Sequence, residues 1–335
     1  MTQSDQTASC VANRVAGIDI AKSKADACIR GLGIRTLGLR LSQPGTTQGY
    51  SAMIAWLREH QVTLAVMEAS GGYERDWAEA LRAAGIVVRV VDPKRVRYFA
   101  RSAGRLAKND TIDAEMIAWF GETFGSIGEE RHDADREVLN RLVTARRLLV
   151  DLAVAVRQLA EHKQPGPVLT AQHAVLETIE AQIAELEAAA EATIEANAQL
   201  AARARIIASV PGFGRRFTAG ALAWLPELGT IANKKLAALV GVAPYDDDSG
   251  RRLGERHIRG GRHDIRNLLY MAALGAATRY NPVIKAYYQR LRGDGKKAKI
   301  ALVACMRKMI TILNTMLNRG ETWNPPADDA MPQVA

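Results

Sequence analysis

Residues 62–93, with the sequence VTLAVMEASGGYERDWAEALRAAGIVVRVVDP, decide the fold of the first part of the chain. The stretch starts with an apolar run typical of a buried strand, continues with a helical pattern that Gly85 closes, and ends with a second strand that stops at Pro93. A strand, a helix and a strand in this order predict an α/β layout around a central sheet.

The residues on both sides extend this pattern. RVAGIDIAKSK, which starts at residue 14, is a β-branched run that ends in a turn, and ADACIRG and RTLGLRLSQ are expected to be further strands. TTQGYSAMIAWLREH has helical spacing, and another helix is expected to begin at Asp110. Three strands and a helix, followed by strand, helix, strand and helix, predict an α/β domain over residues 12–130.

The rest of the chain is expected to be helical. Residues 136–204 hold two long helical patterns separated by QPGP, and the apolar residues of the second pattern step by three and four, which predicts an antiparallel hairpin with a coiled-coil seam. Such a hairpin can serve as a spacer arm or an oligomer contact, or it can pack on its own domain. Residues 205–322 are expected to form a mostly α-helical C-terminal domain, and residues 323–335 a Pro-rich tail.

Composition excludes several classes of protein. The chain has 335 residues, of which 48% are hydrophobic and 24% charged, as is ordinary for a soluble protein of two domains. Because no apolar run reaches the length of a membrane span and the N-terminus lacks the apolar region of a signal peptide, we expect a cytoplasmic protein without membrane contact. The three Cys and six His follow no metal-ligand spacing, which argues against a zinc site and a disulfide framework.

The positive charge of the chain is concentrated in its C-terminal part. The formal net charge is +9, but residues 203–320 contain 22 Lys and Arg against 7 Asp and Glu, a surplus of 15. The remainder of the chain is therefore net acidic. This asymmetry predicts a polyanionic partner for the C-terminal part, although charge alone also fits an ordinary soluble surface.

Four carboxylates are candidates for a metal site. Asp110 and Asp113 stand one helical turn apart at the start of the helix in AKNDTIDAEMIAWF, where an N-cap explains them and where two residues on one helical face can also hold a divalent cation. Asp19 in GIDIAKS and Glu68 in VMEAS accompany apolar strands, in which a lone charge is costly. If these two strands are neighbours, the four carboxylates meet as a two-metal site for phosphoryl displacement.

This series of carboxylates on this order of elements resembles the ribonuclease-H fold of RuvC-like junction resolvases. The strings GVAPYDDDSGRRLGERHIRGGRHDIRNLLYMAAL and NPVIKAYYQRL…GKKAKIALVACMRK are similar to the second domain of the DEDD insertion-sequence transposases, also called bridge-RNA-guided serine recombinases. Both halves and the helical arm match in order, so the resemblance covers nearly the whole chain.

The resemblance implies a catalytic role for five residues. Asp19, Glu68, Asp110 and Asp113 would bind Mg²⁺ or Mn²⁺, while Ser249 would attack a DNA phosphate and hold the strand as a phosphoserine, so that strands are rejoined without ATP. It also implies double-stranded target and donor DNA, a structured guide RNA, and a homo-oligomer, either a dimer or a tetramer. Taken alone, DDDSG is a turn sequence, in which most serines have no catalytic role.

Further segments are candidate contacts to nucleic acid. VPGFG resembles a helix-hairpin-helix, whose glycines let the backbone approach a phosphate, and it also fits a plain turn between helices. DPKRVRYFARSAGRLAK interleaves cations with Tyr98 and Phe99, which could stack on unpaired bases, and it also fits a solvated basic face. The candidate contacts are Gly212 and Gly214 in the first segment, Lys94, Arg95, Arg97, Arg101 and Arg105 in the second, Arg251, Arg252, Arg256, Arg259 and Arg262 after Ser249, and Lys296, Lys297 and Lys299 before the last helix.

These features predict a DNA recombinase of an insertion sequence, and three other functions stay open. A metal-dependent junction-resolving nuclease would use only the carboxylates and water, so it would remain active without Ser249. A sugar-kinase or actin-like ATPase would suit GIDIAKS, but a second nucleotide-binding half is missing and the basic C-terminal part counts against it. A non-catalytic RNA- or DNA-binding protein would not depend on a metal.

Overall fold

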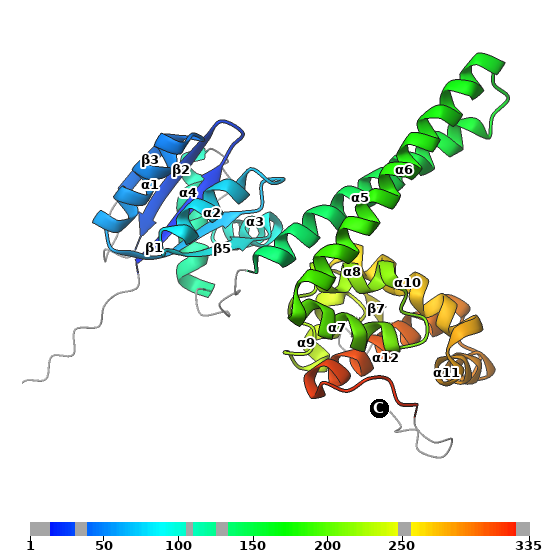
Figure 1. Cartoon of the computed structure of the whole chain (residues 1–335). Helices are drawn as coiled ribbons and strands as arrows, with labels where there is room; N and C mark the ends of the chain where they lie inside the picture. The colour runs from blue at the N-terminus through cyan, green and yellow to red at the C-terminus, as the bar shows by residue number, and fades with distance from the viewer. Residues whose placement is uncertain (1–13, 31–38, 105–109, 125–132, 247–255, 326–335) are drawn as a thin grey trace, which may run out of the picture. The chain divides into compact units, whose positions relative to one another are not determined.

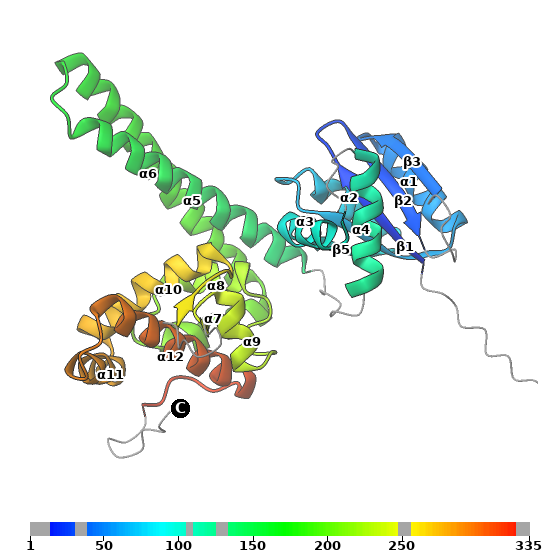
Figure 2. The same cartoon turned by 180° about the vertical axis from the view of Figure 1, so that it is seen from behind.

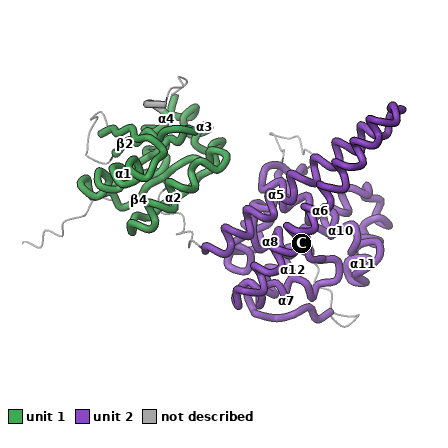
Figure 3. The backbone as a smooth tube through the Cα atoms, turned by 45° about the horizontal axis from the view of Figure 1, so that its top comes forward, with its two compact units in different colours: residues 1–132 green, residues 133–335 purple. Residues whose placement is uncertain are grey.

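The chain folds into two compact units, residues 1–132 and residues 133–335 (Figure 3). The structure is a computed structural model that describes residues 14–30, 39–104, 110–124, 133–246 and 256–325, with only the backbone described at positions 110–112. Each unit has its own apolar core. The predicted mixture of an α/β part followed by a helical part is confirmed.

Unit 1 is built on a five-stranded mixed sheet (Figure 1). The strand order is β3-β2-β1-β4-β5, in which β1 pairs antiparallel with β2 and parallel with β4, β2 pairs antiparallel with β3, and β4 pairs parallel with β5. This order fits the ribonuclease-H-like arrangement expected from the sequence. The strands are β1 Arg14–Ile20, β2 Lys24–Arg30, β3 Leu39–Pro44, β4 Val62–Glu68 and β5 Val87–Val91.

Helices cover both faces of this sheet. One core cluster joins α1 and α2 to the side chains of Ile18 and Met67, and the other joins α3 and α4 to Val15 and Val66. Figure 1 shows α1 and α2 in front of the sheet, and Figure 2, from behind, shows α4 in front. Unit 1 is therefore a three-layer α/β/α unit. The helices are α1 Thr47–Glu59, α2 Glu74–Ala83, α3 Pro93–Ser102 and α4 Asp110–Phe124.

Helix α4 packs directly on β1 because glycine leaves room for its backbone. A Cβ on Gly17 would overlap the carbonyl oxygen of Ala114 and the amide of Ala118, so the helix touches the strand main chain at this point. Further along α4, a Cβ on Gly121 would lie 2.7 Å from methyl carbons of Val15 and Val66. Since α4 advances from Gly17 toward Val15, its N-terminal turn points to the end of β1 that follows Gly17.

Replacing Gly17 with alanine is expected to reduce the free energy of unfolding of unit 1 by about 3 kcal/mol, because the added methyl group must displace main-chain atoms of α4. Urea unfolding followed by fluorescence would measure the change. Gly45→Ala is the matched control, since the nearest atom to a Cβ there lies 3.8 Å away. Equal stability of the two variants would contradict a tight contact between α4 and β1.

Unit 2 begins with the predicted helical hairpin, formed by α5 Ala134–Ala160 and α6 Gly166–Ala196 (Figure 1). Pro165 stands just before α6, as expected from QPGP. The second of the two helical patterns in residues 136–204 was expected to be one helix, but α6 ends at Ala196 and α7 starts at Ala198. Asn197 is the cause, because its side chain accepts hydrogen bonds from the amides of Gln199 and Leu200 and so caps a new helix. The coiled-coil character of the hairpin stays a prediction.

The remaining helices of unit 2 pack around one core that includes residues of α5 and α6. Helix α12 is long and apolar enough to cross a membrane by composition, but half of that window is buried inside the structure. Its apolar side chains, from Leu302 to Leu313, form the centre of the core, which favours a core helix. The elements are α7 Ala198–Ser209, α8 Arg215–Trp224, α9 Asn233–Val240, β6 Pro244–Tyr245, β7 His257–Ile258, α10 His263–Gly275, the π-helix Ala276–Tyr280, α11 Pro282–Gly293 and α12 Ala298–Arg319.

Candidate active site

Asp19 and Glu68 lie at the same edge of the sheet and on the same face. Parallel strands β1 and β4 pair Gly17 with Val66 and Ile18 with Met67, so Asp19 and Glu68 come next on the two strands. Because side chains alternate along a strand, Asp19 shares the face of Gly17, and Glu68 that of Val66. This is the face that α4 covers, and both residues are partly buried.

Helix α4 starts on the side of this edge and carries Asp113 in its first turn. Its first turn points beyond Gly17 toward the end of β1, and Asp113 directly precedes Ala114, whose carbonyl oxygen contacts Gly17. The positive end of the helix dipole lies at the same place and favours negative charge there. Asp110 is the first residue of α4, but its side chain and the residue that would cap the helix fall outside what the structure describes.

The chemistry of these donors fits a hard divalent cation, because carboxylate oxygens are the ligands that Mg²⁺ takes in proteins. The shared edge of Asp19 and Glu68 is what the predicted convergence of the carboxylates requires of β1 and β4. Among the side chains described, however, no group of three or more His, Cys, Asp or Glu is assembled closely enough to hold a metal ion. The predicted four-carboxylate metal site therefore stays a prediction.

A further acid on this face, Asp26, was not singled out from the sequence. It is the direct partner of Asp19 in the register of β1 and β2. Lys24 Nζ lies 2.7 Å from its carboxylate. Burial raises the pKa of Asp26, but hydrogen bonds from Lys24 and Ser42 and the charge of Lys24 lower it, and the net shift is downward. Asp26 is thus already engaged by a cation of the protein.

Glu74 fixes the loop that leads out of β4, and the sequence alone did not reveal this role. One oxygen of its buried carboxylate accepts hydrogen bonds from the Ser70 amide at 2.9 Å, the Ser70 hydroxyl at 3.0 Å and the Gly72 amide at 2.9 Å. Burial raises the pKa of Glu74, but these bonds lower it, and the net shift is downward. Strand β4 ends at Glu68, and Ser70 follows two residues later. Glu74 therefore fixes the backbone directly after Glu68.

Glu74→Gln is expected to destabilise unit 1 by about 2 kcal/mol at neutral pH, because a charged acceptor of three hydrogen bonds becomes neutral. The lowered pKa means that this stabilisation is complete above the ordinary carboxyl value of 4.5 and is lost as the pH falls through the lower value of the folded state. Urea unfolding at neutral and acid pH would test it, with Glu79→Gln on the exposed side of α2 as the control. A deficit that persists unchanged in acid would contradict the charged role.

Ser249 lies outside the residues that the structure describes, as do Arg251 and Arg252. The two ends of its segment are nevertheless joined. Strands β6 and β7 pair Tyr245 with His257, and Arg256 Nε lies 2.6 Å from the Asp246 carboxylate. Asp246 therefore forms an ion pair with a neighbouring arginine. This contact explains the presence of one of the three aspartates that directly precede Ser249.

The arginines that follow this segment differ in their surroundings. Arg262 donates two hydrogen bonds of 2.6 Å to the Glu227 carboxylate and a third, of 2.8 Å, to the Trp224 carbonyl. Both terminal nitrogens of the guanidinium thus donate hydrogen bonds within unit 2, which favours a structural role for Arg262 over the predicted phosphate contact. Arg259 is exposed, and its predicted role remains a prediction.

The two glycines of VPGFG serve different purposes. Gly212 has φ +107°, and a Cβ there would lie 2.8 Å from Ala276 Cβ, so this glycine is required by packing against the helix that follows α10. Gly214 faces open space and caps α8. Gly212 is therefore required by the fold, and the predicted phosphate contact of the two glycines stays a prediction.

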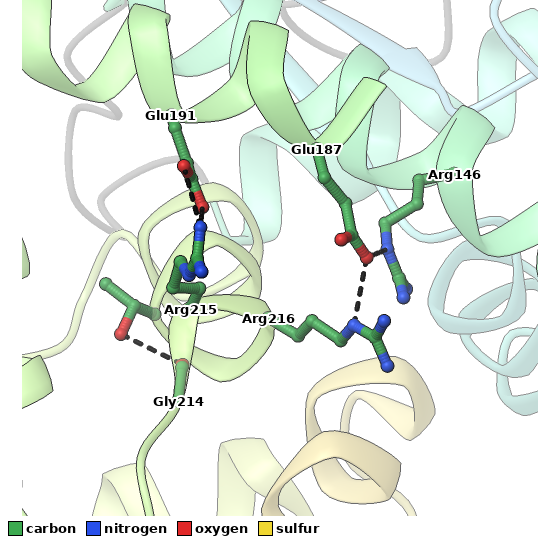
Figure 4. A network of polar contacts seen from close by, with 7 residues as sticks. Arg146, Glu187, Glu191, Gly214, Arg215 and Arg216 are labelled. Atoms are coloured by element: carbon green, nitrogen blue, oxygen red, sulfur yellow. Dashed lines mark hydrogen bonds and ion pairs between the residues drawn. The ribbon is translucent and has the colours of Figure 1, made fainter. Parts of the chain in front are cut away.

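Two arginines at the start of α8 are bound by the hairpin, as Figure 4 shows. Arg215 Nη1 lies 3.0 Å from Glu191, and Arg216 Nε lies 2.9 Å from Glu187, which also accepts from Arg146 Nε at 2.6 Å. These ion pairs tie α6 to α8 beside a cavity of about 800 Å³. The acidic face of α6, which the sequence shows as six Glu without Lys or Arg, thus has basic partners within its own unit.

The basic segment of unit 1 forms α3, with Asp92 as its N-cap. Its four described cations are exposed, as a nucleic-acid contact requires, but this does not distinguish a contact from a solvated face. Phe99 is partly buried against Trp119, Phe120 and Phe124 and is unsuited to stacking on bases, whereas Tyr98 is 64% exposed. The exposed cations are Lys94, Arg95, Arg97 and Arg101 on α3, and Lys296, Lys297 and Lys299 near the start of α12; Arg105 is outside the described residues.

A mixed sheet with carboxylates at one edge, joined to a basic helical unit, fits an enzyme that acts on DNA, and comparison with known proteins names the family. The family model of DEDD transposases of the IS110 type, described as "Transposase", matches residues 16–162. A second model, described as "Transposase IS116/IS110/IS902 family", matches residues 204–289. The chain belongs to the IS110/IS116/IS902 family of transposases, and it is an enzyme of DNA recombination.

Individual relatives agree with this assignment. The chain is 23% identical over 328 residues to the pilin gene-inverting protein of Moraxella lacunata, covering 92% of the chain and 97% of the relative, and the same values hold for that of Moraxella bovis. It is 36% identical over 126 residues to the insertion element IS116 uncharacterized 44.8 kDa protein of Streptomyces clavuligerus, covering 37% of the chain and 31% of the relative. The DEDD family suggests that a divalent metal ion takes part.

Proposed function

We propose that this transposase cuts and rejoins DNA through a phosphoserine on Ser249, with a divalent cation at Asp19, Glu68, Asp110 and Asp113, and that an element-encoded structured RNA guides it. The observation that supports the proposal is the common face and edge of Asp19 and Glu68, on the face of β1 where α4, which carries Asp113 in its first turn, packs. The resemblance of the second unit to serine recombinases supports the role of Ser249.

In this mechanism the Ser249 oxygen forms a bond to a DNA phosphorus while the bond to the adjacent nucleotide oxygen breaks. The serine gives up its proton, and the departing strand leaves with a hydroxyl end. The new phosphodiester keeps the energy of the old one, so attack by another strand's hydroxyl rejoins DNA and restores the serine. Asp19, Glu68, Asp110 and Asp113 would hold the divalent cation, which would supply positive charge to stabilise the phosphate during the displacement.

The catalytic residues belong to both units of the chain: the carboxylates to unit 1 and Ser249 to unit 2. Joining two DNA duplexes that are each cut on two strands requires several serines. We therefore include in the proposal a homo-oligomer, a dimer or a tetramer, with double-stranded target and donor DNA, acting in the cytoplasm. The hairpin of α5 and α6 is the candidate contact between protomers.

The test is to incubate the full-length protein with the RNA that flanks its element, Mg²⁺ and a labelled junction DNA, and to separate the products on a denaturing gel. A protein-linked DNA strand that requires Mg²⁺ is the expected result. Omission of the RNA should abolish the product if the RNA guides the enzyme. Cleaved DNA without any protein-linked strand would refute the phosphoserine and leave a metal-dependent junction-resolving nuclease.

A further inference from the structure

The loop between β4 and α2, residues 69–73, leaves the sheet at the edge where the carboxylates of β1 and β4 lie. Two of its residues, Gly71 with φ +74° and Gly72 with φ +110°, adopt backbone conformations that favour glycine. The buried carboxylate of Glu74 accepts three hydrogen bonds from the loop. The loop is therefore held in one conformation by contacts inside the protein.

A guanidinium group lies against this loop. A Cβ built on Gly72 would lie 3.9 Å from both Cζ and Nε of Arg75, so the side chain of Arg75 folds back over the glycine. Arg75 is partly exposed, and its side chain forms no hydrogen bond or ion pair with the residues that the structure describes. Its charge can therefore pair with an anion that arrives from solvent.

The same loop ends with an aromatic ring on the surface. The side chain of Tyr73 is 48% exposed and makes no ring contact within the described part of the chain. Since Tyr73 follows Glu68 by five residues, the two cannot be more than about 18 Å apart. An exposed ring next to a cation is the combination that binds unpaired nucleic acid, because the ring stacks on a base while the cation meets the backbone.

The position of the loop suits a DNA strand that approaches the carboxylates. Asp19 and Glu68 share the face that α4 covers, whereas α2 lies on the opposite face, so the loop crosses the edge of the sheet between the two faces. A strand that lies across this edge meets the carboxylates on one side and the loop on the other. Because the carboxylates repel phosphates, a cation beside them is needed to hold the strand there.

We propose that Arg75 and Tyr73 bind the DNA strand on which the carboxylate edge acts, within about five nucleotides of the phosphate that reacts. The Arg75 guanidinium pairs with a backbone phosphate, and the Tyr73 ring stacks on an unpaired base. The contact reads no sequence, because every base has a face on which a ring can stack. The inference rests on the proposed function for the place of the reaction, and it adds residues that hold the strand there.

The test compares the full-length protein with its Arg75→Gln and Tyr73→Leu variants. Fluorescence anisotropy would follow binding to a fully paired junction DNA, and to the same junction with unpaired bases at its centre, between about 50 and 200 mM salt. Arg75→Gln should make the slope of log K against log salt concentration shallower by about 0.9 on the paired DNA, because one phosphate contact is lost. Tyr73→Leu should weaken binding about tenfold on the DNA with unpaired bases and leave binding to the paired DNA unchanged.

Arg82→Gln is the matched control, since it removes a partly exposed arginine from the other end of α2. Arg75→Lys keeps the charge and Tyr73→Phe keeps the ring, so these two variants should bind like the wild type. An equal change of slope in Arg82→Gln would overturn the phosphate contact, because general charge would then explain the binding. An equal loss on both DNAs in Tyr73→Leu would overturn the stacking contact.

Binding does not require cleavage, so this inference and the proposed function can fail separately. A wild-type protein that forms no protein-linked strand in Mg²⁺, while Arg75→Gln and Tyr73→Leu still change binding as expected, would refute the phosphoserine and retain the inference. A protein-linked strand in the wild type, with binding unchanged in both variants, would refute the inference alone.

Discussion

Substituting Asp19 by asparagine is expected to slow metal-dependent DNA cleavage about a thousandfold, equivalent to about 4 kcal/mol of lost transition-state stabilisation. Asparagine keeps the shape of the side chain at the end of β1 but removes the charge that attracts a cation. Glu68→Gln should act in the same direction, since Glu68 shares the face and edge of Asp19. Single-turnover cleavage of a labelled junction DNA in Mg²⁺ would measure both effects.

Asp26→Asn is the matched control for Asp19→Asn. The two aspartates are direct partners across β1 and β2, so each substitution removes one charge from the same place in the sheet. Asp26 is already held by Lys24, so its variant should keep most of the activity. Equal losses in both variants would point to a disturbed sheet, and full activity of Asp19→Asn would exclude a metal at this edge. Thermal unfolding of each variant shows whether the fold persists.

The layout of unit 1 could be predicted because each element carries a strong local pattern. Residues 62–93 alternate strand, helix and strand with clear stops, and the structure has β4, α2 and β5 there. The register could not be predicted, since it depends on contacts such as that of α4 with Gly17, in which a missing side chain is the essential feature. The end of α6 was missed because an apolar period continues through Asn197, whose capping bonds involve only its local backbone.

Candidate site residues could be predicted from the sequence where a residue type is unusual for its own segment. Asp19 and Glu68 stand out because each accompanies an apolar strand, where a charge is unexpected. Glu74 was missed because an acid in the first turn of a helix is usually exposed, and only the return of the loop buries it. The internal hydrogen bonds of Arg262 could not be predicted, because its partner Glu227 lies 35 positions away in the sequence. Such long-range pairs require the fold.

Replacing Ser249 by alanine is expected to abolish the protein-linked DNA strand and strand exchange completely. Alanine lacks the oxygen that would bond to phosphorus, and a neighbouring water cannot form a covalent link between protein and DNA. Binding of DNA and RNA should remain, because the cations of unit 2 are unchanged. A denaturing gel for the adduct and a gel-shift assay for binding would be run on the same samples.

Ser209→Ala is the matched control, because residues 133–335 contain no serine besides Ser209 and Ser249. The Ser209 hydroxyl donates to the Ile206 carbonyl and accepts from the Trp323 amide, so it is engaged in holding the end of α7. This variant should form the adduct. An adduct that persists in Ser249→Ala would place the nucleophile elsewhere, and mapping the labelled peptide would locate it. Loss of the adduct in Ser249→Ala but not in Ser209→Ala would assign the phosphoserine to the segment between β6 and β7. Unit 2 would then be the unit that carries the DNA strand between cleavage and rejoining.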